Sequence, residues 1–360
     1  MKILIIRANP RKSGYTQKLT DLFIQGLKQG QAEVQEIDLK SKEIQQCLGC
    51  YHCWLVTPGK CVHNDDMAAV MQVFTGADVV VFATPLYIYN ISGTLKVFFD
   101  RLLPYMKNEH LTSHDVIRNA IRIPGQWPQK MAYILVGAFR GHIPFEGAQK
   151  TLQLFSEGLN LPLCGALVRP ESYLLPFTYL KPKTVRTVMA AFKTAGLELA
   201  TQGKISEATA AKASAALTEN TEHFIEDSNI YWQEAQALGI QAQEPDRVAE
   251  VVVKNPRILL SEMVRHVDPK VTARVRVAIQ FDFTDRDTCF TITVNKGKAV
   301  LEEIAGDTCD LKITTTSEVW AQIFLGEINA LNALREKKLL VQGDKSLFTR
   351  LDKYFPLPFD

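Results

Sequence analysis

"TPLYIYNISGTLKVFFDR" at residues 84–101 carries the chain from a strand-like segment into a helix-like one. Before it, "ADVVVFATP" at 77–85 is a short, apolar and β-branched run, as expected of a strand that is buried on both faces. After the turn residues, "GTLKVFFDRLL" at 93–103 is expected to form a helix. The stretch therefore predicts a strand, a loop and a helix of the kind from which parallel sheets are built.

The loop between these two elements is a candidate binding site. It leaves the predicted strand at its carboxyl end, which is where open α/β sheets bind their ligands. Pro85 makes the loop rigid, and Asn90 offers a hydrogen-bonding group. Tyr87 and Tyr89 offer flat surfaces on which an aromatic ring system can stack. The alternative is that both tyrosines are amphipathic residues at the rim of the fold.

The same alternation of elements extends over the first 170 residues of the chain. Four further segments predict strands, at 2–6, 32–39, 131–138 and 163–170. Apolar residues at helical spacing follow at 19–27, and the segment 148–159 also has helical character. Because parallel strands need crossover connections, the pattern predicts an α/β fold, a doubly wound five-stranded parallel sheet in flavodoxin-like order.

Length and composition limit what the protein can be. The 360 residues are enough for two domains, and a hydrophobic content of 46% indicates a globular chain. A formal net charge of +2 gives no reason to expect nucleic acid or an anionic membrane as a partner. No apolar run approaches the roughly 18 residues of a transmembrane segment. The apolar core of "MKILIIRANP" is too short for a signal peptide, so we expect a cytoplasmic protein.

The first predicted strand runs into "RANPRKSGYTQKL" at residues 7–19. A loop between a first strand and a first helix is suited to a phosphate, because free backbone N–H groups and the helix dipole favour an anion there. Asn9, Arg11, Ser13 and Thr16 add side-chain donors. Neither the glycine fingerprint of dinucleotide-binding folds nor the P-loop pattern is present. An ordinary polar loop remains the alternative.

Four of the seven cysteines fall within "CLGCYHCWLVTPGKC" at residues 47–61, with the spacing C-x2-C-x2-C-x7-C. Disulfides are rare in the cytoplasm, so such a cluster is more typical of a metal or redox site. The remaining three, Cys164, Cys289 and Cys309, lie in strand-like runs and are expected to be core or half-buried thiols.

Several of these motifs together point to a known family. They are "NPRKSGYT" (9–16), "CLGCYHC" (47–53), "GKCVHNDDM" (59–67) and the stretch at 84–101. In this order they resemble the NAD(P)H-dependent FMN reductase and iron–sulfur flavoprotein group of the flavodoxin-like superfamily. The resemblance covers about residues 1–235 and implies FMN as cofactor and NAD(P)H as co-substrate.

The resemblance also implies which residues contact FMN. Its phosphate would lie among Asn9, Arg11, Ser13 and Thr16, and its isoalloxazine ring beside Pro85, Leu86, Tyr87 and Asn90. A third contact would come from the loop near Gly137, Ala138 and Phe139. Ala8 and Asn9 depart from the usual Gly-Ser of the group, which loses a hydroxyl, and Tyr15 replaces a smaller polar residue. No side chain is expected to be an essential acid or base, so no catalytic residue is assigned.

Within that group the compact cysteine motif resembles the ligand set of a [4Fe–4S] cluster, which Cys47, Cys50, Cys53 and Cys61 would bind. Two alternatives stay open: a loop that binds no metal, and a zinc or thiol–disulfide site. His52 and His63 are expected to be surface residues. Asp65 and Asp66 are expected to cap the following helix.

Residues 183–238 are expected to be a helical extension, because apolar residues recur there at a period near 3.6. The polar stretch "GIQAQEPDR" at 239–247 is a candidate linker. The predicted domains are therefore 1–240, the FMN-binding domain with its helical tail, and 250–360.

In the second domain "VRVAIQFDF" at 275–283 alternates apolar and polar residues, which predicts an antiparallel sheet with one buried face. Asp310, Gly326 and "KLLVQGD" at 338–344 resemble a sterol-carrier-protein-type lipid-binding domain of α+β fold. Ser317 is the expected N-cap of the helix that ends at Gly326. The residues expected to line or close an apolar tunnel are Trp320, Ile323, Phe324, Leu331, Leu334, Leu347 and Phe348. The alternative is that these residues are part of the hydrophobic core and line no tunnel.

The sequence thus predicts an FMN-dependent NAD(P)H oxidoreductase that reduces a flavin, a quinone or another acceptor, a hydrophobic one included. The resemblance further implies a homo-oligomer. One alternative is an FMN and [4Fe–4S] protein that passes single electrons between partners. Another is a lipid-binding module on a degenerate flavodoxin scaffold, with a hydrophobic ligand in the C-terminal domain.

Overall fold

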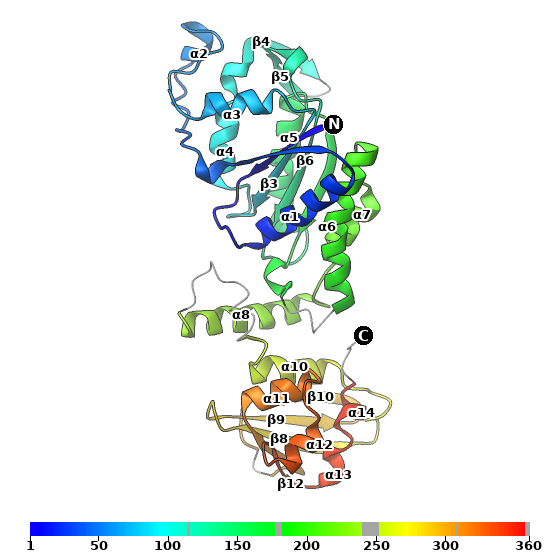
Figure 1. The fold of residues 1–360 in the computed structure, drawn as a ribbon. Coiled ribbons are helices and arrows are strands. Elements are labelled where there is room, and N and C mark those ends of the chain that lie inside the picture. Colours follow the sequence, from blue (N-terminus) through cyan, green and yellow to red (C-terminus); the bar gives the residue numbers. More distant parts are fainter. Residues whose placement is uncertain (114–115, 177–181, 240–251, 307, 357–360) are drawn as a thin grey trace. The chain divides into compact units, whose positions relative to one another are not determined.

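The computed structural model describes residues 1–113, 116–176, 182–239, 252–306 and 308–356 (Figure 1). The chain divides into two compact units, Met1–Leu175 with Lys183–Glu219, and Pro176–Pro182 with Asn220–Asp360. The helical tail is split between them: α6 (Pro182–Gln202) and α7 (Glu207–Ala213) pack with the first unit, and α8 (Thr221–Ala237) packs with the second. Apart from Gly239, the candidate linker lies outside the described residues. No helix in the described ranges is long and apolar enough to cross a membrane.

The first unit is built on a five-stranded sheet of order β2-β1-β3-β6-β7 in which every pairing is parallel (Figure 1). Its strands are β1 (Lys2–Arg7), β2 (Glu33–Asp38), β3 (Val79–Pro85), β6 (Lys130–Val136) and β7 (Leu163–Arg169). Counting only these strands, the order is 2-1-3-4-5, which is that of flavodoxin-like folds. The predicted fold class and all five predicted strands are confirmed.

Helices cover both faces of this sheet because β1, β3, β6 and β7 are apolar and mostly buried. The covering helices are α1 (Tyr15–Gln29), α3 (Met67–Phe74), α4 (Gly93–Asp100) and α5 (Glu146–Gly158). The short helix α2 (His52–Leu55) lies in the segment between β2 and α3 and does not pack on the sheet. One core cluster joins α3, α4 and α5 to the sheet, with Phe82 of β3 in edge-to-face contact with Phe99 and Phe155. On the other side α1 packs against β3 and β6.

A separate two-stranded antiparallel hairpin, β4 (Met106–Ser113) and β5 (Val116–Ile121), follows α4. The sequence analysis did not predict it. Its strands pair with each other and are not part of the five-stranded sheet.

The second unit contains a mixed sheet of order β10-β9-β8-β11-β12. Its strands are β8 (Arg276–Phe283), β9 (Thr288–Asn295), β10 (Lys298–Glu302), β11 (Leu311–Thr315) and β12 (Leu340–Gly343), and its other helices are α10 (Pro256–Arg265), α11 (Ser317–Phe324), α12 (Ala330–Arg335), α13 (Lys345–Phe348) and α14 (Leu351–Tyr354). The expectation of a purely antiparallel sheet was wrong, since β11 runs parallel to β8. From the edge strand β10 the chain crosses to the free side of β8, and this crossover gives β11 the direction of β8.

The α+β character of this unit is confirmed, and its apolar residues form one core. Four of the seven expected tunnel residues are buried in that core, Ile323 and Leu334 pack against it, and Leu331 is exposed. The sterol-carrier resemblance and its tunnel remain predictions. The N-cap of α11 is Thr316, whose hydroxyl accepts a hydrogen bond from the backbone N–H of Val319. Ser317 instead bonds to Asp285 through its N–H and its hydroxyl, so its expected capping role was wrong.

Candidate functional site

Three loops meet at the carboxyl edge of the five-stranded sheet, as parallel strands require. They are the β1–α1 loop (8–14), the β3–α4 loop (86–92) and the β6–α5 loop (137–145). The Ser92 hydroxyl donates to the Ala8 carbonyl over 2.9 Å, which joins the first two loops. The Leu86 N–H donates to the Val136 carbonyl over 2.8 Å, so the second loop begins against the end of β6. The structure therefore brings the three predicted FMN-contacting segments to one edge.

The β1–α1 loop has the features of an anion site. Gly14 is the N-cap of α1 and provides no capping side chain, so the first N–H groups of the helix point toward the loop. Arg11 and Ser13 are exposed beside them, and Thr16 is buried in the first turn.

Asn9 is the buried polar residue of this loop, with 7% of its surface exposed. Its amide nitrogen donates to the Arg11 carbonyl over 2.8 Å and to Gln17 Oε1 over 3.2 Å. Its Oδ1 is buried and has no hydrogen-bond partner among the described residues. An orphaned polar atom beside an uncapped helix suits a ligand that carries both a phosphate and a hydroxylated chain, as FMN does.

The β3–α4 loop is a tight turn. The N–H and carbonyl groups of Tyr87 and Asn90 exchange two hydrogen bonds of 2.8 and 3.0 Å. Ile88 and Tyr89 between them have φ angles of 45° and 61°, in the left-handed region. Such a turn resembles type I′, which normally contains Asn or Gly, so holding these two residues there costs about 1 kcal/mol or more each. Strained backbone beside a predicted ligand site is typical of functional loops.

The β6–α5 loop packs directly on this turn. A Cβ atom at Gly137 would lie 2.7 Å from Phe145 Cζ and 3.0 Å from Leu86 Cβ, so only glycine fits between the two loops. The ring of Phe139 stacks on the ring of Tyr89, with centroids 5.5 Å apart and planes inclined by 3°. Both rings are about half exposed, and together they form a flat aromatic surface, here called the aromatic platform.

The four predicted metal ligands lie on one loop, residues 46–63, here called the cysteine loop. Cys47 and Cys50 are exposed, Cys61 is partly exposed and Cys53 is 7% exposed. Burial raises the pKa of Cys53, with the neighbouring Cys61 adding to it. The donor set matches what an iron–sulfur cluster takes. However, in the described residues no three His, Cys, Asp or Glu side chains converge closely enough to hold a metal ion.

The base of the cysteine loop is held by a buried ion pair that the sequence analysis did not find. Arg101 is 1% exposed, and its Nη1 and Nη2 lie 2.5 and 3.0 Å from the two carboxylate oxygens of Asp65. Arg101 Nη1 also donates to the Gln45 carbonyl over 2.7 Å, and Asp65 accepts from the Gln45 N–H over 2.9 Å. Arg101 thus holds the two ends of the cysteine loop together, because it bonds both to Gln45 before the loop and to Asp65 after it.

Of the two aspartates expected to cap α3, only Asp65 bonds to the start of that helix. Asp65 accepts from the Met67 N–H over 3.1 Å at the start of α3, so it serves this helix end. Asp66 holds the N-cap position without a side-chain capping bond and accepts instead from the Glu43 N–H over 2.9 Å. His63 is partly exposed, with Nε2 3.0 Å from the Gln46 carbonyl. His52, the first residue of α2, is partly exposed.

The lowered pKa of the Asp65 carboxylate predicts that the folded protein loses stability in acid. Burial raises the pKa of Asp65, but hydrogen bonds from Arg101 and from the backbone of Gln45 and Met67 outweigh it and lower the pKa to about 2. In the unfolded chain the value is about 3.9. Because the folded pKa is the lower one, the stabilisation is complete above about pH 4 and is lost as the pH falls through 2.

We therefore expect the free energy of unfolding to fall between pH 4 and 2, and to fall less steeply in Asp65→Asn. Urea unfolding at several pH values measures both slopes. Equal slopes in the two proteins would contradict this assignment.

Comparison with known sequences bears on the first unit. Residues 1–143 match the family described as NADPH-dependent FMN reductase. The N-terminal domain is FMN reductase-like. The expected oxidoreductase class and its FMN and NAD(P)H chemistry agree with the description of this family, which the chain matches over these 143 residues.

Individual proteins are also similar to parts of this chain. An iron–sulfur flavoprotein of Archaeoglobus fulgidus is 36% identical over 105 residues, which are 29% of this chain and 47% of that relative. An FMN-dependent NADH:quinone oxidoreductase of an Exiguobacterium species is 26% identical over 141 residues, 34% of this chain and 67% of that protein. The chain spans about half the length of the first curated relatives it matches. Among solved structures, an FMN-dependent NADH-azoreductase from Bacillus anthracis aligns with a TM-score of 0.42 and 17% identity, covering 55% of this chain and 99% of that one.

The C-terminal region matches a different family from the one that the sequence analysis named. Residues 247–358 match the family described as alkyl sulfatase C-terminal. A sterol-carrier domain and lipid binding are not shown by any of these comparisons, and both stay predictions.

Proposed function

We propose that this protein is an FMN-dependent NAD(P)H oxidoreductase that reduces a flavin, a quinone or another acceptor, a hydrophobic one included. The observation that carries the proposal is the meeting of three loops at the carboxyl edge of a sheet whose sequence matches FMN reductases. Bound FMN would supply the chemistry of hydride transfer from the nicotinamide and electron transfer to the acceptor. The protein's own contribution is binding, orientation and electrostatics.

In this proposal each loop has its own role. Asn9, Arg11, Ser13 and Thr16 and the N-terminus of α1 bind the phosphate. Pro85, Leu86, Tyr87 and Asn90 form the wall along the ring, held in place by the bonds of Leu86 to Val136 and of Tyr87 to Asn90. Gly137 allows the third loop to approach Leu86 closely. No side chain is assigned as an acid or base.

A second candidate is an electron-transfer flavoprotein with a [4Fe–4S] cluster. Two observations favour it: four cysteines share one loop, and several relatives are named iron–sulfur flavoproteins. Cys47, Cys50, Cys53 and Cys61 would hold the cluster after the cysteine loop has closed around it.

We expect protein purified without oxygen to show flavin absorption bands that NAD(P)H bleaches. The same sample is assayed for iron and acid-labile sulfide. Flavin alone supports the reductase; flavin with about four iron atoms supports the cluster. In the second case Cys47→Ser should lose most of the iron, whereas Cys289→Ser, in β9 of the second unit, should keep it.

Absence of flavin after FMN has been added back would refute both redox functions. Lipid that co-purifies with such a protein would leave the lipid-binding module as the function.

A further inference from the structure

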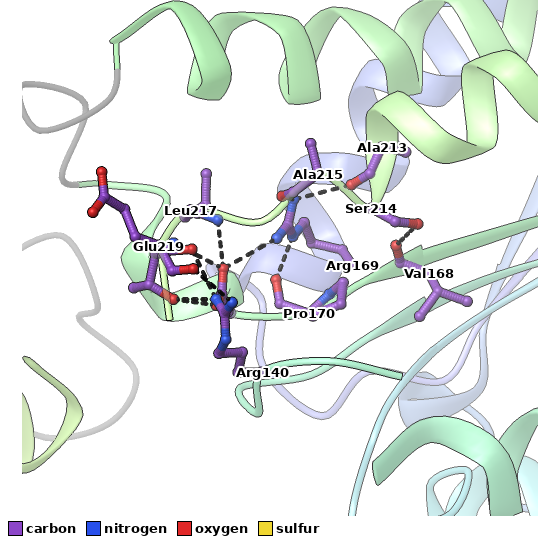
Figure 2. Close-up of polar contacts among 11 residues, drawn as sticks. Arg140, Val168, Arg169, Pro170, Ala213, Ser214, Ala215, Leu217 and Glu219 are labelled. Atoms are coloured by element: carbon purple, nitrogen blue, oxygen red, sulfur yellow. Dashed lines mark hydrogen bonds and ion pairs between the residues drawn. The ribbon is translucent and has the colours of Figure 1, made fainter. Parts of the chain in front are cut away.

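A buried ionic cluster lies at the carboxyl end of β7, outside the groups used so far (Figure 2). Arg169 is 0% exposed and Glu171 is 1% exposed, while Arg140 of the β6–α5 loop is partly buried. Charged groups at this depth are strongly unfavourable unless they are paired and hydrogen-bonded. The cluster is therefore a built feature of the fold, and its partners show what it holds in place.

The backbone around Glu171 holds the β6–α5 loop at two points. Its N–H donates to the Phe139 carbonyl over 3.0 Å, and the next N–H, of Ser172, donates to the Gly137 carbonyl over 3.0 Å. Glu171 has a φ of 51°, in the left-handed region, where a residue other than glycine stays only if its surroundings fix it. The corner at Glu171 thus determines where Phe139 lies.

The Glu171 side chain fixes this corner to the segment after α7. Its carboxylate accepts from the Thr218 hydroxyl and from the Leu217 N–H, each over 2.5 Å, and from Arg140 Nη1 over 3.1 Å. These donors compensate the buried negative charge.

Arg140 ties the loop to the same segment from the other side. Besides Glu171 it donates to the Thr218 carbonyl over 2.8 Å, the Thr218 hydroxyl over 2.7 Å and the Glu219 carbonyl over 3.1 Å (Figure 2). Because Arg140 directly follows Phe139, these bonds restrict the ring that stacks on Tyr89.

Arg169 holds the beginning of this segment against β7. Its Nη1 donates to the carbonyls of Ala213 and Ala215 over 3.0 and 2.8 Å. The Ser214 hydroxyl donates to the Val168 carbonyl over 2.9 Å. Residues 213–219 are therefore fixed along the end of the sheet and connect α7 to the β6–α5 loop.

We propose that Glu171, Arg140 and Thr218 are positioning residues for the FMN site. They set the place of Phe139 in the aromatic platform and of Gly137 against Leu86, although none of the three is assigned to contact the flavin. This inference rests on the proposed FMN binding. It adds that the cofactor loop depends on the tail segment 213–219, which ends where the second unit begins.

The test uses the full-length chain with Thr218→Val, and Thr209→Val as its matched control. Thr218 and Thr209 are 7% and 5% exposed, and each donates its hydroxyl to a glutamate, Glu171 over 2.5 Å and Glu198 over 2.7 Å. Only Thr218 is linked to the β6–α5 loop. Two quantities are measured: the FMN dissociation constant, from quenching of FMN fluorescence, and the hydrogen-exchange rates of the Gly137, Glu171 and Ser172 amides.

We expect Thr218→Val to raise the FMN dissociation constant about tenfold and to speed exchange at the three amides by a similar factor. Thr209→Val should change neither. Arg140→Lys, which keeps the charge but cannot serve four acceptors, should act like Thr218→Val in case the valine variant folds poorly.

The outcomes separate this inference from the proposed function. If the unaltered protein binds FMN but Thr218→Val and Arg140→Lys match the control in both measurements, the positioning role is refuted and the proposed function stands. If the unaltered protein does not bind FMN, the proposed function fails and the inference fails with it.

Discussion

Arg101→Met should lower the free energy of unfolding by about 3–5 kcal/mol. The substitution leaves the Asp65 carboxylate, which is 4% exposed, without its cation, and an uncompensated buried charge is among the most destabilising changes a protein can undergo. It also removes the bond from Arg101 to the Gln45 carbonyl, so the cysteine loop loses its fixed base. Urea unfolding measures the first effect.

The second effect is measured with a thiol reagent on the native protein. Cys53 is buried in the intact structure and should react slowly, whereas in Arg101→Met it should react at a rate close to that of Cys47. Lys96→Met is the matched control, because Lys96 pairs with Asp100 on the same helix but both side chains are about half exposed. That variant should lose less than about 1 kcal/mol. Similar losses in both variants would show that the Arg101–Asp65 pair does not hold the loop.

The Arg101–Asp65 ion pair could not be predicted from the sequence. A charged residue at the end of an apolar helical segment normally points to solvent, and nothing near Arg101 indicates otherwise. Its burial depends on Asp65, which lies 36 positions earlier and was expected only to cap a helix. Pairs so distant in the chain cannot be recognised from local patterns.

The central sheet, by contrast, could be predicted because its signal lies in short local segments of the sequence. Four of its five strands are short apolar runs, and β3 is buried at all seven positions, so the signal is local and strong. The hairpin of β4 and β5 was missed because β4 is largely polar and Arg118 and Asn119 interrupt the apolar residues of β5, so neither strand gives such a signal. In the second unit the alternation in β8 predicted which face is buried, but alternation carries no information about direction, so the parallel placement of β11 was not predicted.

The candidate site was only partly accessible from the sequence. The motifs predicted the three loops, because loops at the carboxyl ends of parallel strands must share one edge. The tight turn at Ile88 and Tyr89 was not predicted, since neither residue type favours a left-handed backbone. The stacking of Phe139 on Tyr89 depends on how two separate loops pack, which the spacing of residues does not determine.

The close contact between α1 and α6 predicts that a side chain added at either of two glycines will destabilise the fold. Gly26 of α1 and Gly196 of α6 face each other where these helices cross. A Cβ atom at Gly26 would lie 1.9 Å from the Lys193 carbonyl oxygen, and one at Gly196 would lie 2.0 Å from the Phe23 carbonyl oxygen. Both collisions are with backbone, which cannot move aside as a flexible side chain can, so the helices would have to separate and lose buried contacts.

Gly196→Ala should therefore lower the free energy of unfolding by at least about 3 kcal/mol, and Gly26→Ala by a similar amount. Helix propensity alone predicts the opposite, since alanine in place of glycine stabilises an unhindered helix by up to about 1 kcal/mol. Gly158→Ala, at the end of α5 with no atom within 4 Å of the new Cβ, provides the control and should be neutral or stabilising. Urea unfolding of the three variants decides between the two effects. A stable Gly196→Ala protein would mean that α6 is not packed on α1 at the distance seen here, and that the helical tail does not form part of the first unit's core.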